Sequence, residues 1–408
     1  MPLSSPRGFT IREAFDRFVA GLEPVDAEDV ILEQAVGRVL AGPVLAGRLV
    51  PDSTRSAVDG WAVRAADLDS ASPDQPVRLR VAGTALAGHP SDQVIASGET
   101  VRITTGGVVP EGADSAEYQE VCRFEGESVI FSRPVAPGAN VRPAGEDMRP
   151  GQELLPAGTR VRPEVAGLLA TLAQEKVSLR RRPRVRLVST GDEIFPLGVA
   201  LPPGGTYDSN SLQIAAQLRA LGAEVQLRGP VQDTAEAIAE ACMGDDFDFL
   251  VTSGGVSVGP ADRIGEVGRM LGASVVFHWA RMRPGAPTMG LRLGGRPWLG
   301  LSGNPLSAQV GFDLFGRAAI AHLLGTRNSL ARVQATLAEE FRAKAPDAPR
   351  FLRANLERKD GMLEARVHPY QSSGGVRAMA QTNGYVLQPE GVGTLPAGSH
   401  AEAFVILC

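Results

Sequence analysis

The chain has 408 residues, which suggests about two to four domains with enough chain for a sizeable core. Its 43% hydrophobic and 21% charged residues are ordinary for a globular protein and exclude wholesale disorder. A net charge of -5 is a poor match for generic nucleic-acid binding, which relies on basic surface. Arginine supplies almost all positive charge, because only Lys176, Lys344 and Lys359 are lysines.

The cysteines and the N-terminus predict where the chain works. Cys122, Cys242 and Cys408 lie far apart, and the five histidines are equally scattered, so neither a zinc site nor a disulfide framework is expected. The first residues lack the apolar core of a signal peptide, and no run of 18 apolar residues occurs. We therefore expect a soluble protein of the reducing cytoplasm that binds neither membrane nor nucleic acid.

The first 180 residues predict two kinds of structure. Thr10 can cap the helical segment IREAFDRFVAGL, and AEDVILEQAVGRVLA and PEVAGLLATLAQE also have helical spacing. The intervening segment is rich in short β runs such as VRLRVAGTA, separated by Gly and Pro. These patterns predict a helical domain of residues 1–47 and 141–180 that carries an inserted β domain of residues 48–140.

The remainder predicts two further domains. Strand patterns alternate with amphipathic helices of ten to twenty residues from 184 to about 325, which is typical of a parallel sheet covered on both faces. We assign residues 181–328 to this α/β domain. The last 80 residues have short β runs with turn signals, and we assign residues 329–408 to a C-terminal β domain. The fold class is therefore multidomain α/β.

Three glycine-rich loops follow predicted strands of the α/β domain, at the sheet edge where open α/β sheets bind ligands. Glycine lets the backbone approach an anion closely, and hydroxyls and free N–H groups at the next helix start bind phosphate oxygens. Each loop alone is more simply a tight turn, but three at one edge favour a phosphate site. The loops are Thr190-Gly191-Asp192-Glu193, Ser253-Gly254-Gly255-Val256-Ser257 and Ser302-Gly303-Asn304-Pro305.

Acidic residues are predicted at the same edge. Carboxylates beside an anion-binding loop are the usual setting for Mg²⁺ that bridges phosphates. Asp208 and Asp233 also have a simpler explanation as helix caps. The acidic set is Asp192, Glu193, Asp208, Asp233, Asp245 and Asp262.

The β segment has its own polar loops, which suggest a second binding surface, although each alone is more simply a β-turn. Sequence spacing does not link them to the α/β loops. They are Ser56-Ala57-Val58-Asp59-Gly60-Trp61, Ile103-Thr104-Thr105-Gly106-Gly107, Pro110-Glu111-Gly112-Ala113-Asp114, Asn140-Val141-Arg142 and Gly145-Glu146-Asp147.

Taken in order, these strings resemble the molybdopterin molybdenumtransferase family, also called the MoeA family or gephyrin E domain. The resemblance covers essentially the whole chain and is highly specific, since RFLR and YQSSG also fit the family's C-terminal domain. The matching strings include SAVDGWAVRAAD, VRITTGG, NVRPAGEDMRPGQELLPAG, VRLVSTGDE, TYDSNS, TSGGVSVGPAD, MRPGAP and SGNPLSA.

The resemblance implies an elongated homodimer that inserts molybdate into adenylylated molybdopterin and releases AMP with the help of Mg²⁺, the last step of molybdenum cofactor biosynthesis. It also implies an active site between one subunit's molybdopterin-binding-like α/β domain and the β segment of the other. Molybdopterin adenylyltransferase and the proteins that mature molybdoenzymes are the implied partners.

The resemblance also implies roles for individual residues. Asp59, Glu193, Asp233 and Asp262 would be catalytic, and the last three would hold Mg²⁺ or orient the attack. The cofactor-binding residues would be Thr105, Arg142, Asp147, Ser253, Gly254, Gly255, Ser257, Arg283, Gly303, Asn304 and Pro305.

Several positions depart from the family pattern. Arg283 replaces the usual lysine before the PGKP string and preserves its charge, and Gly265 and Ser302 replace a common Lys and Pro. Trp279 and Ala286 stand where the family has lysines, so we expect a weaker grip on an anionic ligand, by roughly 1.5–3 kcal/mol for each buried charged hydrogen bond lost.

Two other functions compete with the metal-inserting enzyme. The missing lysines favour a family member that has become a binding or scaffold module, whereas the intact carboxylates disfavour it. The related adenylyl transfer to molybdopterin needs only a single α/β domain, so the additional domains argue against it.

Overall fold

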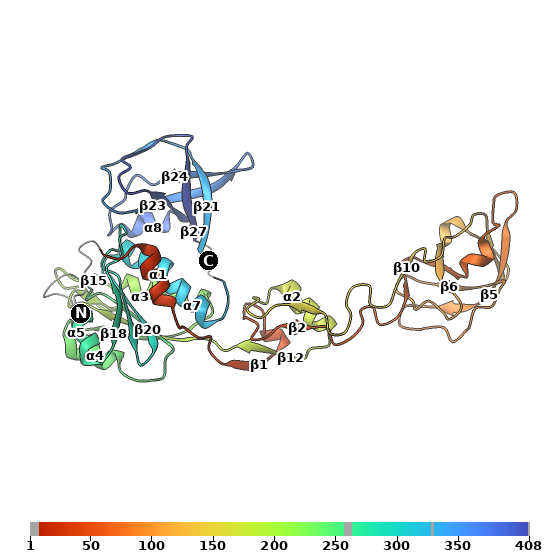
Figure 1. Cartoon of the computed structure of the whole chain (residues 1–408), viewed down its shortest axis with the longest axis horizontal. Helices are drawn as coiled ribbons and strands as arrows, with labels where there is room; N and C mark the ends of the chain where they lie inside the picture. Colours follow the sequence, from red (N-terminus) through yellow and green to blue (C-terminus); the bar gives the residue numbers. More distant parts are fainter. Residues whose placement is uncertain (1–7, 257–262, 328–329, 407–408) are drawn as a thin grey trace. The chain divides into compact units, whose positions relative to one another are not determined.

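The computed structural model describes residues 8–256, 263–327 and 330–406 (Figure 1). The chain divides into two compact units. The β unit comprises Pro43–Pro156 and Leu168–Gln174, and the main unit comprises Met1–Gly42, Ala157–Gly167 and Glu175–Cys408.

The first helix, α1 (Ile11–Val19), begins where the sequence predicts it. The Thr10 hydroxyl accepts the backbone N–H of Glu13 at 3.2 Å, and the Glu13 carboxylate accepts the backbone N–H of Thr10 at 2.9 Å. This reciprocal capping satisfies two N–H groups that the first turn would otherwise leave free. The helix buries Ala14 and Phe18.

The helix predicted over AEDVILEQAVGRVLA is wrong. Its first residues form strand β1 (Ala27–Ile31), and Leu32–Gln34 form a single 3₁₀ turn. β1 pairs antiparallel with β12 (Lys176–Arg180) over five residues, so its backbone groups bond across strands rather than along a helix. Pairing with a segment 145 positions away overrides the local helical spacing. The other predicted helix is confirmed as α2 (Pro163–Thr171).

The β unit contains a six-stranded sheet in the order β7-β4-β6-β5-β9-β8, in agreement with the predicted β structure. Its apolar side chains include Trp61, Leu79 and Phe131, which are buried in one cluster. Two short antiparallel pairs, β2 with β11 and β3 with β10, complete the unit. The strands are β2 (Val44–Leu45), β3 (Arg55–Ser56), β4 (Gly60–Val63), β5 (Val77–Ala85), β6 (Glu99–Ile103), β7 (Ser115–Tyr118), β8 (Arg123–Glu125), β9 (Ser128–Phe131), β10 (Val141–Arg142) and β11 (Glu153–Leu155).

The α/β sheet of the main unit has the order β16-β13-β17-β20-β19-β18. The first four strands are parallel, as predicted, but β19 runs antiparallel to both neighbours, so the sheet is mixed. Gly294 and Gly295 explain the difference, because both adopt positive φ and close a tight hairpin between β19 and β20. The strands are β13 (Arg184–Thr190), β16 (Glu224–Val231), β17 (Phe249–Ser253), β18 (Ser274–His278), β19 (Met289–Leu293) and β20 (Arg296–Leu301).

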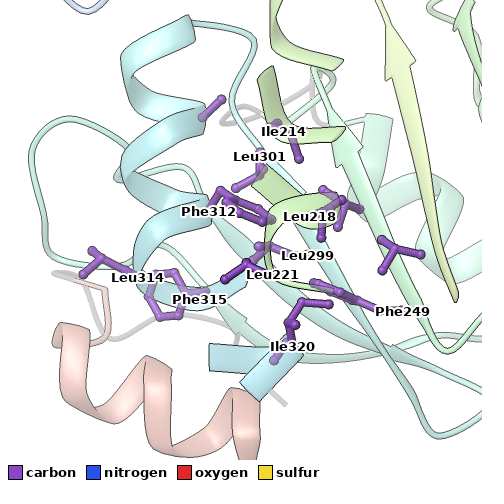
Figure 2. Packing of buried hydrophobic residues seen from close by; sticks show 14 of the residues in the cluster. Ile214, Leu218, Leu221, Phe249, Leu299, Leu301, Phe312, Leu314, Phe315 and Ile320 are labelled. Atoms are coloured by element: carbon purple, nitrogen blue, oxygen red, sulfur yellow. The ribbon is translucent and has the colours of Figure 1, made fainter. Parts of the chain in front are cut away.

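Helices cover both faces of this sheet, because successive strand residues point to opposite faces. Phe249 and Val251 pack with α1, α3, α6 and α7, where Figure 2 shows Leu218, Phe312 and Phe315 around Leu299. Leu250, Val188 and Trp298 pack with α4 and α5 on the other face. The helices are α3 (Ser209–Ala220), α4 (Ala235–Cys242), α5 (Arg263–Met270), α6 (Pro305–Gly311) and α7 (Arg317–Leu323), with a π-helical turn at Phe312–Gly316 between α6 and α7.

The C-terminal part of the main unit is a closed five-stranded barrel in the order β21-β24-β23-β25-β27. Leu352, Ala354, Val386 and Ala403 fill its interior. Closure leaves no unpaired edge among these strands. The elements are β21 (Leu330–Leu337), β23 (Arg350–Lys359), β24 (Met362–Val367), α8 (Val376–Ala380), β25 (Gly384–Gln388) and β27 (His400–Ile406), beside the pair β22 (Phe341–Arg342) and β26 (Thr394–Leu395).

Candidate active site

The three predicted loops meet at the carboxyl edge of the α/β sheet, because β13, β17 and β20 are adjacent and parallel. Asn210, in the first turn of α3, joins two of these loops. Its amide nitrogen donates to the Ser253 hydroxyl at 3.0 Å and to the Gly303 carbonyl at 2.9 Å. Its Oδ1 atom is buried and has no hydrogen-bond partner among the described residues. A buried, unpaired acceptor at a loop cluster indicates a place for a donor from a ligand.

Gly254 allows the loops after β13 and β17 to approach each other. It has a φ of +99°, and a Cβ added there would lie 2.3 Å from the Thr190 carbonyl oxygen. Its N–H donates to the Leu301 carbonyl at 3.0 Å, which ties the same loop to β20. Gly255, with a φ of +67°, continues the left-handed turn. The predicted close backbone approach is therefore present, although Ser257 lies outside the described residues.

Two of the acidic residues are linked at this edge. The Thr190 hydroxyl donates to the Asp233 carboxylate at 3.2 Å, and the Asp233 N–H donates to the Asp192 carboxylate at 3.1 Å. Thr234, not Asp233, caps α4. Glu193 follows Asp192 and is exposed, which leaves its carboxylate accessible to a ligand.

Of two other acidic residues in the described part of the chain, Asp208 lies at the start of α3, which begins at this edge, whereas Asp245 lies elsewhere. Asp208 caps α3, since its carboxylate accepts the Ser211 N–H at 3.0 Å, so the simpler explanation is confirmed. Asp245 precedes β17 and therefore lies at the amino end of that strand, opposite the loops. The sequence pattern did not show that Asp245 lies at the amino end of its strand, where the loops do not.

The metal prediction is tested only in part. Within the described parts of the chain, no group of three His, Cys, Asp or Glu side chains could hold a metal ion. Asp262, the third predicted ligand, lies outside the described residues. The donors at the edge, Glu193 and Asp233, are hard oxygen ligands of the kind that Mg²⁺ prefers.

In the β unit, the structure brings together Asp59 and Thr105. The Asp59 carboxylate accepts the Thr105 backbone N–H at 2.7 Å, and both residues are exposed. Ser56 holds the same loop, because its carbonyl accepts the Gly106 N–H at 2.8 Å. An exposed carboxylate that is oriented by a neighbouring loop fits a role in binding.

The other predicted residues of the β unit lie on the β3–β10 pair and the turn after it. Arg142 pairs with Arg55 in the ladder, and its guanidinium contacts the Glu146 carboxylate at 3.3 Å. The Asp147 backbone N–H donates to the Val50 carbonyl at 3.0 Å, and the residue is exposed. Among the described residues, no hydrogen bond or ion pair joins Arg142 or Asp147 to Asp59, so their common role stays a prediction.

Comparisons with known proteins decide the family. The MoeA N-terminal region (domain I and II) matches residues 9–173, a probable molybdopterin binding domain matches 186–322, and the MoeA C-terminal region (domain IV) matches 334–406. The molybdopterin molybdenumtransferase of Bacillus subtilis is 35% identical over 390 residues, which are 93% of this chain and 90% of the relative. The enzyme of the same name from Staphylococcus aureus is 30% identical over 393 residues, which are 95% of this chain and 93% of that relative.

The chain belongs to the molybdopterin molybdenumtransferase family. A crystal structure of the molybdopterin biosynthesis MoeA protein from Pyrococcus horikoshii agrees with this assignment, with a TM-score of 0.86 at 29% identity. It covers 98% of this chain and 100% of the other. No helix among the described residues is long and apolar enough to cross a membrane.

Three of the five positions at which this chain departs from the molybdenumtransferase pattern line one cleft of about 1010 Å³. Trp279, Arg283 and Ala286 line one wall, on the loop after β18. Trp279 has an unusual φ of +68°, and its indole nitrogen has no hydrogen-bond partner within the described residues. The opposite wall comes from the barrel and includes Arg350 and Gln371.

Arg283 does not point freely into this cleft. Its guanidinium forms two hydrogen bonds with the Asp347 carboxylate of the barrel, at 2.6 and 2.7 Å. These hydrogen bonds raise the pKa of Arg283 and lower that of Asp347. Its predicted contact with the cofactor therefore requires competition with Asp347, which the sequence did not indicate.

Sequence reasoning missed Asn210 as a site residue. It lies in TYDSNS beside Asp208, whose carboxylate made Asp208 the candidate residue of that string. The signal that could have identified it is its position two residues after a helix cap, on a helix that starts at the ligand-binding edge of the sheet.

Proposed function

We propose that this chain transfers molybdate to adenylylated molybdopterin and releases AMP. The observation that carries the proposal is the convergence of three loops at one sheet edge, joined by Asn210 and closed by Gly254, with Asp233 beside them. Glycine-based backbone approach and free N–H groups suit the phosphates of a nucleotide-linked substrate. The names of the full-length relatives support the same reaction.

We assign each group of residues a role in this reaction from the chemistry of its side chains and backbone. Ser253, Gly254, Gly255, Gly303, Asn304 and Pro305 would bind and orient the phosphate and pterin groups at the loops. Glu193 and Asp233, together with Asp262, would hold Mg²⁺, which when bound neutralises charge on the phosphoanhydride that is cleaved. The buried Asn210 Oδ1 accepts a donor from the substrate. The arginine-lined cleft beside the barrel would take the oxyanion, because planar guanidinium groups of Arg283 and Arg350 match tetrahedral oxygen pairs.

The decisive experiment measures AMP. Purified protein is incubated with adenylylated molybdopterin, Mg²⁺ and molybdate, and released AMP is separated by chromatography. Wild type should release AMP in proportion to added substrate, whereas Glu193→Gln should lower the rate by about 10²-fold or more, since the loss of one well-placed charged group typically costs that much. Glu236→Gln, which changes an exposed carboxylate on α4, is the matched control.

Two results would contradict the proposal. AMP release that is absent from wild type at every molybdate concentration would favour a binding or scaffold module, consistent with the lost cations at Trp279 and Ala286. A wild-type rate in Glu193→Gln would remove this carboxylate from the chemistry. Omission of Mg²⁺ tests the metal separately, and titration with Mg²⁺ should restore the rate.

We further propose that the active protein is a homodimer whose site combines Asp59, Thr105, Arg142 and Asp147 of one subunit with the α/β loops of the other. Two polar clusters, each incomplete for the reaction, support this arrangement. Mixed Asp59→Asn and Glu193→Gln chains should recover activity, because some heterodimers retain one intact site. Demonstrated heterodimers without recovered activity would contradict the shared site.

The same function implies a setting in the cytoplasm, downstream of a molybdopterin adenylyltransferase that supplies the substrate and upstream of proteins that mature molybdoenzymes. Cell fractionation with antibodies to the chain tests the location.

A further inference from the structure

A buried polar network joins the α/β domain to the C-terminal barrel. Asp313, Arg317 and Tyr385 are 1%, 2% and 2% exposed. The Arg317 guanidinium donates to Asp313 Oδ1 at 2.8 Å, and the Tyr385 hydroxyl donates to Asp313 Oδ2 at 2.8 Å. Asp313 thus binds an arginine of its own domain with one oxygen and a tyrosine of the barrel with the other.

The network also reaches the helices that begin at the candidate site. Arg317 donates to the Gln217 side chain at 3.2 Å, and Gln217 lies on α3, two helical turns after Asn210. The Gln309 side chain, on α6, hydrogen-bonds the Asp313 carboxylate. The helix that follows Asn304 is therefore attached to this buried carboxylate directly, and the helix that carries Asn210 is attached to it through Arg317.

The backbone at this point is unusual. Asp313 lies in the π-helical turn Phe312–Gly316, between α6 and α7. Single π-helical turns within α-helices are rare and recur at functional sites. Burial also raises the pKa of the Tyr385 phenol well above its ordinary value, so the hydroxyl remains a donor to Asp313.

The other polar contacts between these two parts lie at the rim of the cleft. Arg283–Asp347 is an exposed ion pair, with side chains 56% and 73% exposed, and Arg281–Glu390 is a second pair. Exposed pairs contribute little to stability and are screened by salt. Three backbone bonds accompany them, from Arg283 N–H to the Pro349 carbonyl at 2.9 Å, from Phe351 N–H to the Arg283 carbonyl at 2.7 Å and from Leu306 N–H to the Ser373 carbonyl at 3.0 Å. The buried network is thus the firmest polar connection behind the cleft.

Stability alone does not explain this network. Replacement of a buried ion pair by apolar residues of similar size is often neutral or stabilising, because burying charges carries a large desolvation cost. Hydrogen bonds are directional, so this network fixes the orientation of the two domains more precisely than an apolar contact would.

We propose that Asp313, Arg317 and Tyr385 are positioning residues that hold the barrel against the α/β domain and so set the geometry of the cleft for the oxyanion. The role in catalysis rests on the proposed function. The network itself touches no substrate and acts through the loops that line the cleft, Trp279–Pro287 on one side and Asp347–Arg350 on the other.

Two variants separate positioning from simple stability. Tyr385→Phe removes the bond between the domains and leaves Asp313 with Arg317. The triple variant Asp313→Leu, Arg317→Met, Tyr385→Phe replaces the whole network with apolar side chains. We expect both to raise KM for molybdate roughly two- to thirtyfold, the range seen for residues that modulate a distant site. The kcat at saturating molybdate should stay near the wild-type value, and Tm of the triple variant should equal or exceed that of wild type.

The control is Arg332→Gln, which breaks an exposed ion pair with Glu402 on the barrel and should change neither constant. An unchanged KM for molybdate in a folded triple variant would overturn the proposal. A KM that rises only in proportion to a falling Tm would also overturn it, since that is the behaviour of a merely structural group.

A second measurement does not depend on activity. Hydrogen exchange of the Arg283 and Phe351 amides, which bond across the two parts, should be faster in Tyr385→Phe than in wild type, while amides of the α/β core should not change. If wild type releases no AMP, the proposed function fails, and this exchange result still decides whether the network positions the cleft. Equal exchange in both proteins would refute the positioning role.

Discussion

The α/β edge and the β-unit loops are both built from short polar segments, yet they are organised differently. At the α/β edge, residues from three strands and one helix are connected by Asn210 and by the Gly254 backbone. In the β unit, Asp59 and Thr105 contact each other through one hydrogen bond, whereas Arg142 contacts Glu146 on its own strand-and-turn segment.

The difference follows from the type of sheet. The four parallel strands of the α/β sheet, β16, β13, β17 and β20, place their carboxyl ends at one edge, so residues far apart in sequence meet there. The mixed sheet of the β unit has loops at both ends, and only loops at the same end can meet. The α/β edge therefore gathers polar groups from several strands in one place, while the β-unit loops present theirs separately.

The largest expected effect tests how tightly the α/β edge is packed. Gly254→Ala should lower stability by roughly 1–3 kcal/mol from its positive φ alone, and more from the Cβ that would meet the Thr190 carbonyl at 2.3 Å. Chemical denaturation measures the change. Gly303→Ala is the matched control for stability, because its φ is not left-handed and its nearest neighbour would lie at 3.8 Å. Equal stability losses in both variants would show that the loops are not held as described.

The next effect tests the connection between the loops. Asn210→Ala removes two hydrogen bonds and should cost about 1–3 kcal/mol of stability, because the buried Ser253 hydroxyl loses a partner. AMP release should fall more steeply than stability, since the buried Oδ1 is also lost to the substrate. Gln213→Ala on the same helix, whose side chain makes no hydrogen bond within the described residues, is the control. Activity that follows Tm alone in Asn210→Ala would reduce Asn210 to a structural role.

The sequence predicted the α/β edge better than the details within it. Glycine-rich loops after strands identified Gly254 and Gly255, because the strand–turn–helix pattern is local. It could not distinguish Asp233, which bonds Thr190, from Asp208, which caps α3, since both precede helices. Strand β1 was predicted as helix because its partner, β12, lies far along the chain. The partnership of Asp313 with Tyr385 is equally invisible, as it depends on how the barrel packs on a π-helical turn.

A smaller effect is expected at Asp59 in the β unit, where two substitutions distinguish the role of the negative charge from that of the hydrogen bond. The amide oxygen of Asp59→Asn can still accept the Thr105 N–H, whereas Asp59→Ala cannot. We expect Tm of Asp59→Asn to remain near that of wild type, and Asp59→Ala to lose about 0.5–1.5 kcal/mol, the net worth of one hydrogen bond. Both should lose AMP release if the carboxylate itself is needed. An active Asp59→Asn would show that Asp59 only shapes the Thr105 loop.

The smallest expected effect is a difference in the reaction rates of two cysteine thiols, one in each region. Burial raises the pKa of both Cys122 in the β unit and Cys242 in the α/β core to about 12, with Glu117 adding to the shift at Cys122. Because the thiolate is the reactive form, its fraction at about pH 8 is about one in ten thousand and rises tenfold per pH unit. A Cys408→Ser protein should therefore show no fast reaction with a disulfide reagent.

Because the folded thiols react slowly, local opening of the structure around each cysteine determines which of the two reacts first. Cys122 is only half-buried, whereas Cys242 is packed among Ile238, Phe247 and Leu250, so Cys122 should react first. Peptide mapping of the labelled protein assigns each phase, and Cys122→Ser should remove the earlier one. If Cys242 reacts first, the α/β domain opens more readily than the β unit. The Gly254 and Asn210 contacts would then belong to a domain that opens more easily than the β unit.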